Sequence, residues 1–207
     1  MRSMANRESG CLRLVFATRN EGKVAELTAL LKETCWAPER LPPSFGNYEE
    51  TGETFADNAR GKALFASAQL SSPVLADDSG LEIDALGGEP GVRSARYIDE
   101  SLSQEERNKA VLDKLSDTPV ELRTAHFFCH LALALDNDIV HETTGRCSGS
   151  IGLAPRGNQG FGYDSIFIVP KLSLTFAEIS LEKKSARSHR GAAMRAMVEF
   201  LGRWRPN

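Results

Sequence analysis

Residues 74–88 read VLADDSGLEIDALGG and place two carboxylates, Asp77 and Asp78, side by side after a short apolar run. The apolar segments on either side of the pair are each short enough for a strand, and the Asp-Ser-Gly between them is a common turn signal. We therefore expect two strands joined by a turn at Ser79 and Gly80. Adjacent residues of a strand point to opposite faces, so only such a turn would bring both carboxylates to one side.

Helical and strand patterns alternate along most of the chain, which is typical of α/β proteins. The expected elements, in chain order, are a strand at 12–18, helices from about 24 and from 54, the two strands above, a helix at 103–115, a hairpin that turns at 136–138, a strand at 165–169 and a helix from about 188. Two capping pairs support the helix starts, Thr54 with Asp57 and Ser103 with Glu106. Because the hairpin is antiparallel, we expect an α/β fold with a mixed central sheet flanked by helices.

The composition limits the class of protein and its partners. A chain of 207 residues, 41% of them hydrophobic, is long enough to bury a substantial core in one domain, with one or two lobes. Its formal net charge of −3 lacks the clustered basic field that nucleic acid or a membrane surface requires, so we expect neither as a partner. No apolar run approaches the roughly 20 residues of a membrane-spanning helix.

The N-terminus and the cysteines bear on location. Residues 1–10, MRSMANRESG, are polar and lack the apolar segment of a secretory signal. We expect residues 1–11 to form a disordered tail and residues 12–207 a single domain. The four cysteines are scattered without zinc-binding spacing, which favours free thiols in a reducing compartment and therefore a cytoplasmic protein.

The aspartate pair admits two interpretations. In the first, Asp77 and Asp78 are solvated charges of an Asx-type turn, which is common where Asp, Ser and Gly cluster. In the second, a divalent cation lies beside them and one carboxylate also takes a proton from water. Glu49 and Glu50, in the segment NYEETGET, are candidate ligands for the same cation. From these residues alone both interpretations stay open.

The hexapeptide TRNEGK, residues 18–23, lies where the first strand gives way to a helix. At such a position backbone amides and the positive end of the helix can hold a phosphate. Thr18 and Asn20 add short polar side chains and Lys23 adds charge, although the segment is not a Walker loop. A capped helix with a surface lysine is the alternative.

Two later segments combine aromatic rings, glycines and cations. GNQGFGYD, residues 157–164, would let backbone approach a ligand while a ring stacks on a flat group, or it is a glycine-rich connection with a core aromatic. KKSARSHRG, residues 183–191, places cations at the entrance to the last helix, where anions are favoured, although a solvated basic surface is the usual explanation. Asn58 and Lys62 lie one turn apart and face the same way on the second helix. They are ordinary surface residues unless the fold places them beside the candidate site residues.

The motifs follow one another in a specific order: TRNEGK, EETGETFADNARGKA, ADDSGLEIDALGGEPGVRSARY, GFGYD and KKSARSHRG. In this order they resemble the inosine triphosphate pyrophosphatase family, also called XTP/dITP diphosphatases, and the resemblance extends from Leu12 to the last helix. It implies a two-lobed homodimer with the active site in the cleft between the lobes. It also implies hydrolysis of ITP, dITP and XTP to the monophosphate and pyrophosphate with Mg²⁺.

The resemblance further assigns chemistry to the acidic residues. Asp78 is the implied proton acceptor and a magnesium ligand. Glu49 or Glu50 is the implied second ligand, and Asp77 is implied to support the metal site. The two aspartates are then tolerable together because a cation and a turn share them.

The remaining implied site residues bind substrate. The implied phosphate ligands are Thr18, Asn20, Lys23 and Lys62. The other implied substrate-binding residues, of which those from Phe161 onward line the nucleoside, are Arg19, Glu21, Gly22, Ser79, Phe161, Gly162, Tyr163, Asp164, Lys184, His189 and Arg190. Hypoxanthine and xanthine present an oxygen at C6 where adenine presents an amino group, so the cationic donors Lys184 and Arg190 would favour the deaminated bases.

Three features depart from the family pattern, and two other functions compete. Arg19 stands where Gly is common, Ser165 stands where Pro is common, and the shortest relatives have no counterpart of the N-terminal tail. A haloacid-dehalogenase-type phosphatase also has aspartates after a strand, but it requires an Asp-x-Asp spacing. A non-enzymatic nucleotide-binding module would keep the lysines and have no use for the acidic residues.

Overall fold

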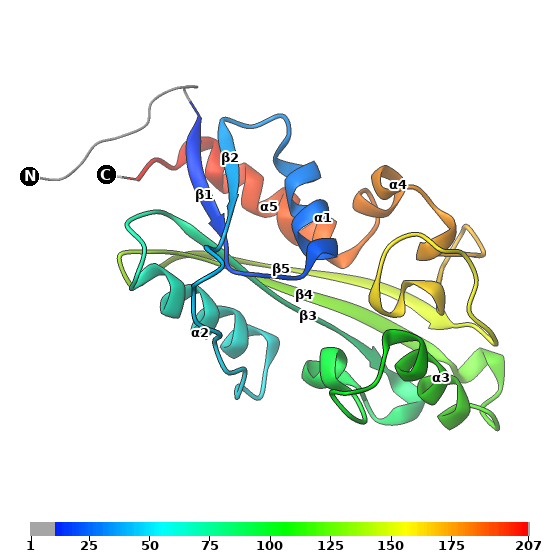
Figure 1. Ribbon diagram of the computed structural model, residues 1–207. Coiled ribbons are helices and arrows are strands. Elements are labelled where there is room, and N and C mark those ends of the chain that lie inside the picture. Colours follow the sequence, from blue (N-terminus) through cyan, green and yellow to red (C-terminus); the bar gives the residue numbers. More distant parts are fainter. Residues whose placement is uncertain (1–10, 207) are drawn as a thin grey trace, which may run out of the picture.

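The computed structural model describes residues 11–206, which build one seven-stranded mixed sheet with helices on both faces (Figure 1). The helices and strands are β1 (Leu12–Phe16), α1 (Glu21–Leu31), β2 (Trp36–Arg40), α2 (Phe55–Ser67), β3 (Val74–Ile83), α3 (Gln104–Lys114), β4 (Thr124–Leu135), β5 (Asp138–Ile151), β6 (Phe167–Val169), β7 (Leu174–Thr175), α4 (Leu181–Ser185) and α5 (His189–Arg203). The strand order is β2-β1-β3-β4-β5-β6-β7. Strands β2, β1 and β3 are parallel and the other pairings are antiparallel, so the predicted mixed sheet is confirmed.

The main error of the sequence prediction lies in β3. Residues 74–83 form one continuous strand that pairs with β4 along its whole length, so the expected turn at Ser79 and Gly80 is wrong. The turn signal is local, whereas the ladder of hydrogen bonds to β4 satisfies the backbone of the strand throughout. Gly80 is needed for close approach instead, because a Cβ there would lie 2.5 Å from Gly91 O and from Ser94 Oγ.

The segment between α1 and α2 holds a strand where only a Pro-containing loop was expected. Strand β2 contains Pro38, which cannot donate to a sheet ladder. A strand with such a residue is tolerated at a sheet edge, and β2 is an edge strand, paired only with β1. The proline therefore concealed the strand from the sequence pattern.

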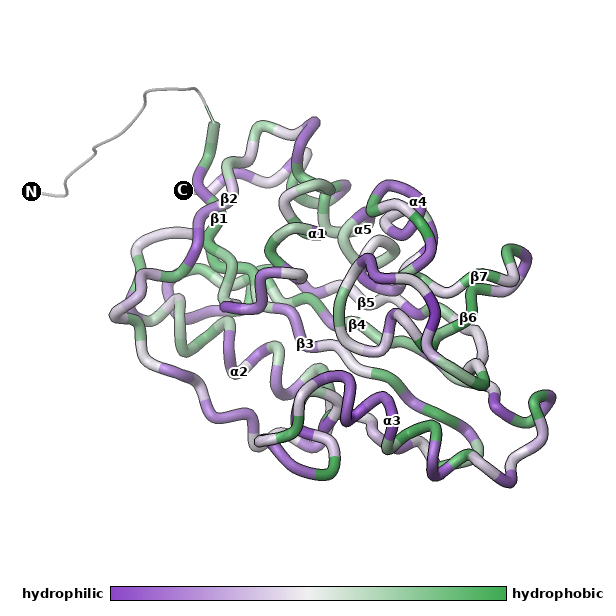
Figure 2. Tube along the Cα trace, turned by 45° about the vertical axis from the view of Figure 1, so that its right-hand side comes forward, coloured by the Kyte–Doolittle hydropathy of each residue, from purple (hydrophilic) through white to green (hydrophobic). Residues whose placement is uncertain are grey.

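The long strands β3, β4 and β5 run through both lobes (Figure 1). In the first lobe, α1 and α5 pack on one face of the sheet around Leu27 and Met194, and α2 packs on the other face around Ala63. In the second lobe, the far halves of these strands pack with α3, β6 and the segment after β7 around Phe127 and Phe176. Green and purple stretches alternate along α3 in Figure 2, as expected for a helix with one buried side.

Several local signals are confirmed. Ser103 and Glu106 form the capping box of α3. The hairpin of β4 and β5 turns at Asp136 and Asn137, both of which adopt the positive φ of a tight turn. No helix within residues 11–206 is long and apolar enough to cross a membrane. The predicted N-terminal tail, apart from Cys11, lies outside the described residues.

Candidate active site

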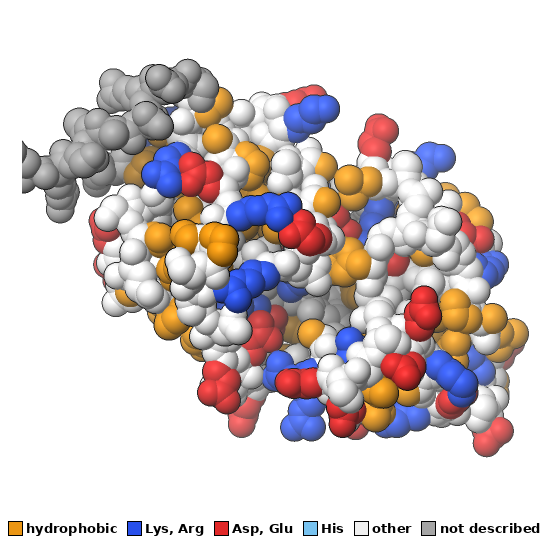
Figure 3. All heavy atoms as spheres, viewed as in Figure 1, with side chains coloured by type: hydrophobic (Ala, Val, Ile, Leu, Met, Phe, Trp, Pro, Cys, Tyr) orange, Lys and Arg blue, Asp and Glu red, His pale blue; other side chains and the backbone are white. Residues whose placement is uncertain are grey.

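The predicted acidic and phosphate-binding residues lie near the carboxyl end of β1, beside the middle of β3. Strand β1 ends at Phe16 and pairs with β3 only as far as Leu75, so the following residues of β3 leave an open edge. Helix α1 covers one face of the sheet here and α2 covers the other. Where helices change faces in this way, a crevice opens at the carboxyl edge and is the usual place for a ligand. Figure 3 shows a hollow between the lobes with blue and red side chains at its rim.

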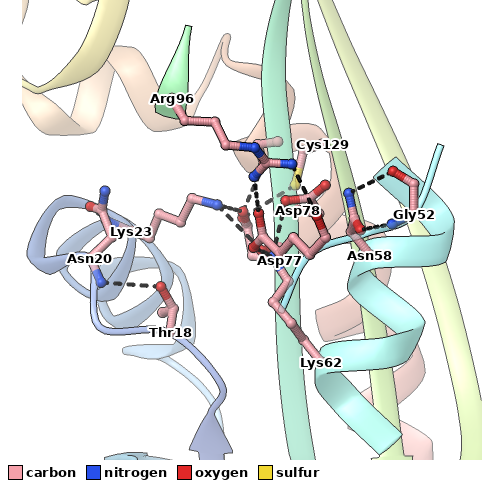
Figure 4. Close-up of polar contacts among 12 residues, drawn as sticks. Thr18, Asn20, Lys23, Gly52, Asn58, Lys62, Asp77, Asp78, Arg96 and Cys129 are labelled. Atoms are coloured by element: carbon pink, nitrogen blue, oxygen red, sulfur yellow. Dashed lines mark hydrogen bonds and ion pairs between the residues drawn. The ribbon is translucent and has the colours of Figure 1, made fainter. Parts of the chain in front are cut away.

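Asp77 and Asp78 point to opposite faces of β3, as alternation along a continuous strand requires. Asp77 faces α1 and α5, where its carboxylate lies 2.6 Å from Lys23 Nζ and 2.7 Å from Arg190 Nε. Asp78 faces α2, where its Oδ1 lies 3.0 Å from Lys62 Nζ. The two charges are therefore tolerated because each has its own cations on its own face (Figure 4).

The two aspartates have pKa values that move in opposite directions. Burial by itself would raise the pKa of Asp77, but the charges of Arg190 and Lys23 outweigh burial and hold that pKa well below its usual value. For Asp78 burial prevails over the attraction of Lys62, and its pKa is raised. The Oδ2 atom of Asp78 is also buried without a hydrogen-bond partner among the described residues. Asp77 is thus a permanent anion of an ion-pair network, while Asp78 keeps an oxygen available for a ligand.

Glu50, not Glu49, turns toward Asp78. Glu49 is exposed, whereas Glu50 is half-buried and lines the cavity beside Asp78. Its Oε1 lies 2.7 Å from Lys62 Nζ, so this ammonium group sits between the Glu50 and Asp78 carboxylates. Arg96, which the sequence did not single out, donates from Nη2 to the Glu50 carbonyl at 3.0 Å. The two carboxylates therefore already share a cation of the protein.

The acidic residues present fit a magnesium ion that completes its coordination elsewhere. No three His, Cys, Asp or Glu side chains within residues 11–206 are grouped as a metal site. Magnesium, however, is usually held by one or two carboxylates together with substrate phosphates and water. Glu50 and the unpartnered Oδ2 of Asp78 meet that requirement. Asp77 faces the other side of β3, where its oxygens contact Lys23 and Arg190, so the structure does not bring its carboxylate to Glu50 and Asp78.

The hexapeptide 18–23 forms the predicted helix entrance. Asn20 caps α1, and its Oδ1 accepts a hydrogen bond of 3.0 Å from the Lys23 backbone. Thr18, Asn20 and Lys23 line a cavity of about 370 Å³ together with Lys62. Cationic side chains from two helices therefore face one space at the positive end of α1.

Of the other members of the hexapeptide, Arg19 also lines this cavity, whereas Glu21 does not. Arg19 donates to Asn47 Oδ1 at 2.7 Å and to the Phe45 carbonyl. Glu21 forms an exposed ion pair with Arg40 of β2 at 2.6 Å. The structure thus places both side chains against the chain that follows α1. Arg19, the departure from the family pattern, braces the loop at residues 45–47.

A second cavity, of about 380 Å³, lies between the lobes and contains the predicted nucleoside residues. Its lining includes Ser79, Phe161, Gly162, Tyr163, Asp164, Lys184, His189 and Arg190. Gly22 explains how the ring of Phe161 reaches α1, because a Cβ at Gly22 would lie 2.2 Å from that ring. The Lys184 ammonium lies 4.7 Å from the centroid of the same ring.

The basic segment at residues 183–191 is only partly solvated: Lys183 and Arg187 are exposed, but a solvated surface is the wrong interpretation for the members that line the cavity. Lys184, His189 and Arg190 are at most 3% exposed. Glu26 of α1, also buried, lies 2.5 Å from both Lys184 Nζ and Arg190 Nη1. Lys184 further contacts Asp164.

Glu26 is the functional residue that sequence reasoning missed. It lies between the buried residues Val24 and Leu27, and this placement of a charge on a helix was the available signal. Through Glu26, the ion pairs run from Asp164 at the nucleoside end to Asp77 near the phosphate end. Its role was invisible because both partners come from residues more than 150 positions away.

The sequence matches the Ham1 family model over residues 14–200. The chain belongs to the Ham1 family. A dITP/XTP pyrophosphatase of Desulforamulus reducens is 45% identical over 194 residues, which cover 93% of this chain and 96% of the relative. A dITP/XTP pyrophosphatase of Gloeobacter violaceus is 46% identical over 190 residues, covering 92% and 94%. The solved structure of a HAM1 protein from Coxiella burnetii has a TM-score of 0.83 at 40% identity and covers 92% of this chain and 98% of that one. The predicted family is therefore confirmed.

Proposed function

We propose that this protein hydrolyses deaminated purine nucleoside triphosphates, namely ITP, dITP and XTP, to the monophosphate and pyrophosphate. The observation that carries the proposal is the pair Glu50 and Asp78, which faces cations from two helices beside the aromatic-lined cavity. The names of the dITP/XTP pyrophosphatases that cover nearly the whole chain support the same activity. Magnesium is the cofactor that the two carboxylates would hold, and when bound it would neutralise phosphate charge.

Phosphoryl transfer depends mainly on positioning and charge neutralisation. Lys23 and Lys62 each contact a carboxylate and the Asp77 carbonyl, so their ammonium groups are held at the floor of the site. The phosphate chain of a substrate would bring oxygens to these groups and to the amides that begin α1. Lys62 would then exchange part of its contact with Glu50 and Asp78 for phosphate oxygens.

Asp78 is the group that would take a proton from the attacking water. Its pKa is raised toward the operating pH, which makes it a stronger base than an ordinary aspartate. Its Oδ2 has no hydrogen-bond partner among the described residues. Asp77, one residue away, keeps its charge in ion pairs with Lys23 and Arg190. The roles of the two aspartates thus follow from the faces on which they lie.

Selection of the base would come from hydrogen bonds at the inner end of the cavity. Lys184 has three N–H donors, and the two that contact Glu26 and Asp164 leave one for the C6 oxygen of hypoxanthine or xanthine. Burial, together with the charge of Arg190, holds the pKa of His189 well below its usual value, so its imidazole is neutral at pH 7. The C6 amino group of adenine is itself a donor and would face the remaining N–H of Lys184. ATP would therefore lack this hydrogen bond.

A panel of substrates tests the proposal. Pyrophosphate release would be followed with ITP, XTP, dITP, GTP and ATP at equal concentration and saturating magnesium. The first three should be turned over at least roughly tenfold faster than ATP, as expected for one mismatched hydrogen bond in a buried site. Comparable rates on all five would remove the proposed selectivity, and no turnover of any would favour the non-enzymatic module.

Two further properties complete the proposal, the first implied by the resemblance and the second by the cysteines. The protein forms a homodimer, which light scattering coupled to gel filtration would test through a mass of twice 22.6 kDa. It is located in the cytoplasm, a proposal supported by the four free cysteines among residues 11–206. Cell fractionation with an antibody against the chain would test the location.

A further inference from the structure

We propose that two buried asparagines, Asn58 and Asn108, are positioning residues, the first for the acidic side of the site and the second for the nucleoside side. This inference rests on the function proposed above. Asn58 is fully buried and Asn108 is 4% exposed. Each lies on a helix and binds the backbone of one loop of the site rather than the cavity itself.

Asn58 holds the loop that carries Glu50. Its Oδ1 accepts a hydrogen bond of 2.8 Å from the Gly52 backbone N–H, and its Nδ2 faces the Gly52 carbonyl at 3.4 Å (Figure 4). A Cβ on Gly52 would lie 2.7 Å from this Oδ1, so position 52 has no room for a side chain beside Asn58. Lys62, one turn further along α2, contacts the Glu50 carboxylate. Helix α2 therefore fixes both the backbone and the side chain of the acidic loop.

Asn108 holds the loop that carries Phe161. Its Nδ2 donates to the Gly162 carbonyl at 3.2 Å and faces Ser165 Oγ at 3.1 Å. Gly162 has a positive φ of 63°, so the loop turns sharply at the contact. Ser165 stands where the family pattern has proline, and here its hydroxyl is a second partner of Asn108.

A hydrogen-bonding side chain is required at both positions, with an acceptor at 58 and a donor at 108, because the loops present backbone groups to the protein interior. A buried N–H or C=O that loses its partner destabilises the segment that carries it. An apolar residue at position 58 would leave the Gly52 N–H unpaired, and one at position 108 would leave the Gly162 carbonyl without this donor. Each loop would then sample other positions while the rest of the fold persists.

Hydrogen exchange of the free enzyme, stripped of divalent cations with EDTA, tests the positioning directly. In Asn58→Ala, amides of residues 49–54 should exchange about tenfold faster while those of 161–166 keep the parent rate. Asn108→Ala should show the reverse. Asn58→Asp keeps the acceptor for Gly52 N–H and should retain protection, whereas Asn108→Asp loses the donor to Gly162 and should not. Uniform acceleration in both loops, or none, would overturn the inference.

Kinetics then separate the two halves of the site. Asn58→Ala should raise the magnesium concentration for half-maximal pyrophosphate release by about tenfold, with the KM for ITP at saturating magnesium within about twofold of the parent. Asn108→Ala should raise the KM for ITP by about tenfold and leave the magnesium dependence unchanged. Identical effects of the two variants on both parameters would contradict separate roles.

Two other outcomes can be told apart from a failure of the inference: misfolding of the asparagine variants, and a parent protein that does not have the proposed activity. Ser165→Ala removes one partner of Asn108 from a position outside the core, so it should raise the KM for ITP in the same direction by a smaller factor even if the Asn108 variants do not fold. For the acidic loop, Asn58→Asp is the corresponding second variant, because it keeps the acceptor for the Gly52 N–H if Asn58→Ala does not fold. If the parent releases no pyrophosphate from ITP, the proposed function fails while the exchange experiment still decides whether each asparagine holds its loop.

Discussion

Glu26→Gln removes the negative charge that Lys184 and Arg190 share. The carboxylate is 3% exposed and lies 2.5 Å from Lys184 Nζ and from Arg190 Nη1. Breaking a buried ion pair by removing one partner typically costs about 3 to 5 kcal/mol. Each cation here keeps a second carboxylate, Asp164 or Asp77, so we expect the lower end of that range, about 3 kcal/mol. In a domain of this size the change lowers Tm by roughly 6 to 12 °C.

Chemical denaturation and thermal unfolding, without nucleotide, measure this effect. The matched control is Glu39→Gln, because Glu39 and Arg13 form an ion pair of similar length, 2.6 Å, on the exposed surface. Exposed pairs contribute about 0.2 to 1 kcal/mol, so the control should change Tm by no more than about 4 °C. Equal losses in the two variants would refute the argument that burial sets the strength of the Glu26 contacts.

The stabilisation that Glu26 provides should also depend on pH, which a comparison of the parent with Glu26→Gln would show. Burial alone would raise the pKa of Glu26, but the charges of Arg190 and Lys184 outweigh it and hold the pKa below its usual value. A lowered pKa in the folded state contributes stability that is present above the unfolded value, about 4.3, and is lost as pH falls through the folded pKa. The difference in unfolding free energy between parent and Glu26→Gln should therefore narrow below about pH 4. A constant difference from pH 7 to pH 3 would contradict this account.

Two further predictions concern the chemistry and the nucleoside side. Asp78→Asn should lower kcat by about 10²- to 10⁴-fold at every magnesium concentration with little change in Tm, and activity within a few-fold of the parent would rule out its role as the base. Gly22→Ala should raise the KM for ITP, because its methyl group would lie 2.2 Å from the Phe161 ring and displace it. Gly202→Ala is the control, since a Cβ there meets nothing within 4 Å, and an equal KM in both variants would show that the ring position is unimportant.

Local signals predicted much of the secondary structure because they act over a few residues. The caps at Thr54 and Ser103 and the turn at Asp136 and Asn137 all form as expected. The turn at Ser79 failed for the opposite reason. Its residues favour a turn in isolation, but pairing with β4, about 50 positions later, decides their conformation.

The membership of the site was predictable, but the arrangement within it was not. The motifs singled out Asp77, Asp78 and Lys62, and the structure brings all three together. Only a continuous β3 shows that the two aspartates serve different faces. Glu26 was missed because its partners, Lys184 and Arg190, belong to the far end of the chain, and no spacing rule connects them.

The central claim is that Glu50 and Asp78 support magnesium-dependent cleavage between the α and β phosphates. Its most direct test is ³¹P NMR of ITP turnover in H₂¹⁸O, before and after EDTA treatment and with magnesium restored. The account predicts equimolar IMP and pyrophosphate, loss of both with EDTA, recovery with magnesium and turnover by Asp78→Asn that is slower by at least about 10²-fold. Release of free phosphate with IDP, or cleavage that persists without a divalent cation, would contradict it.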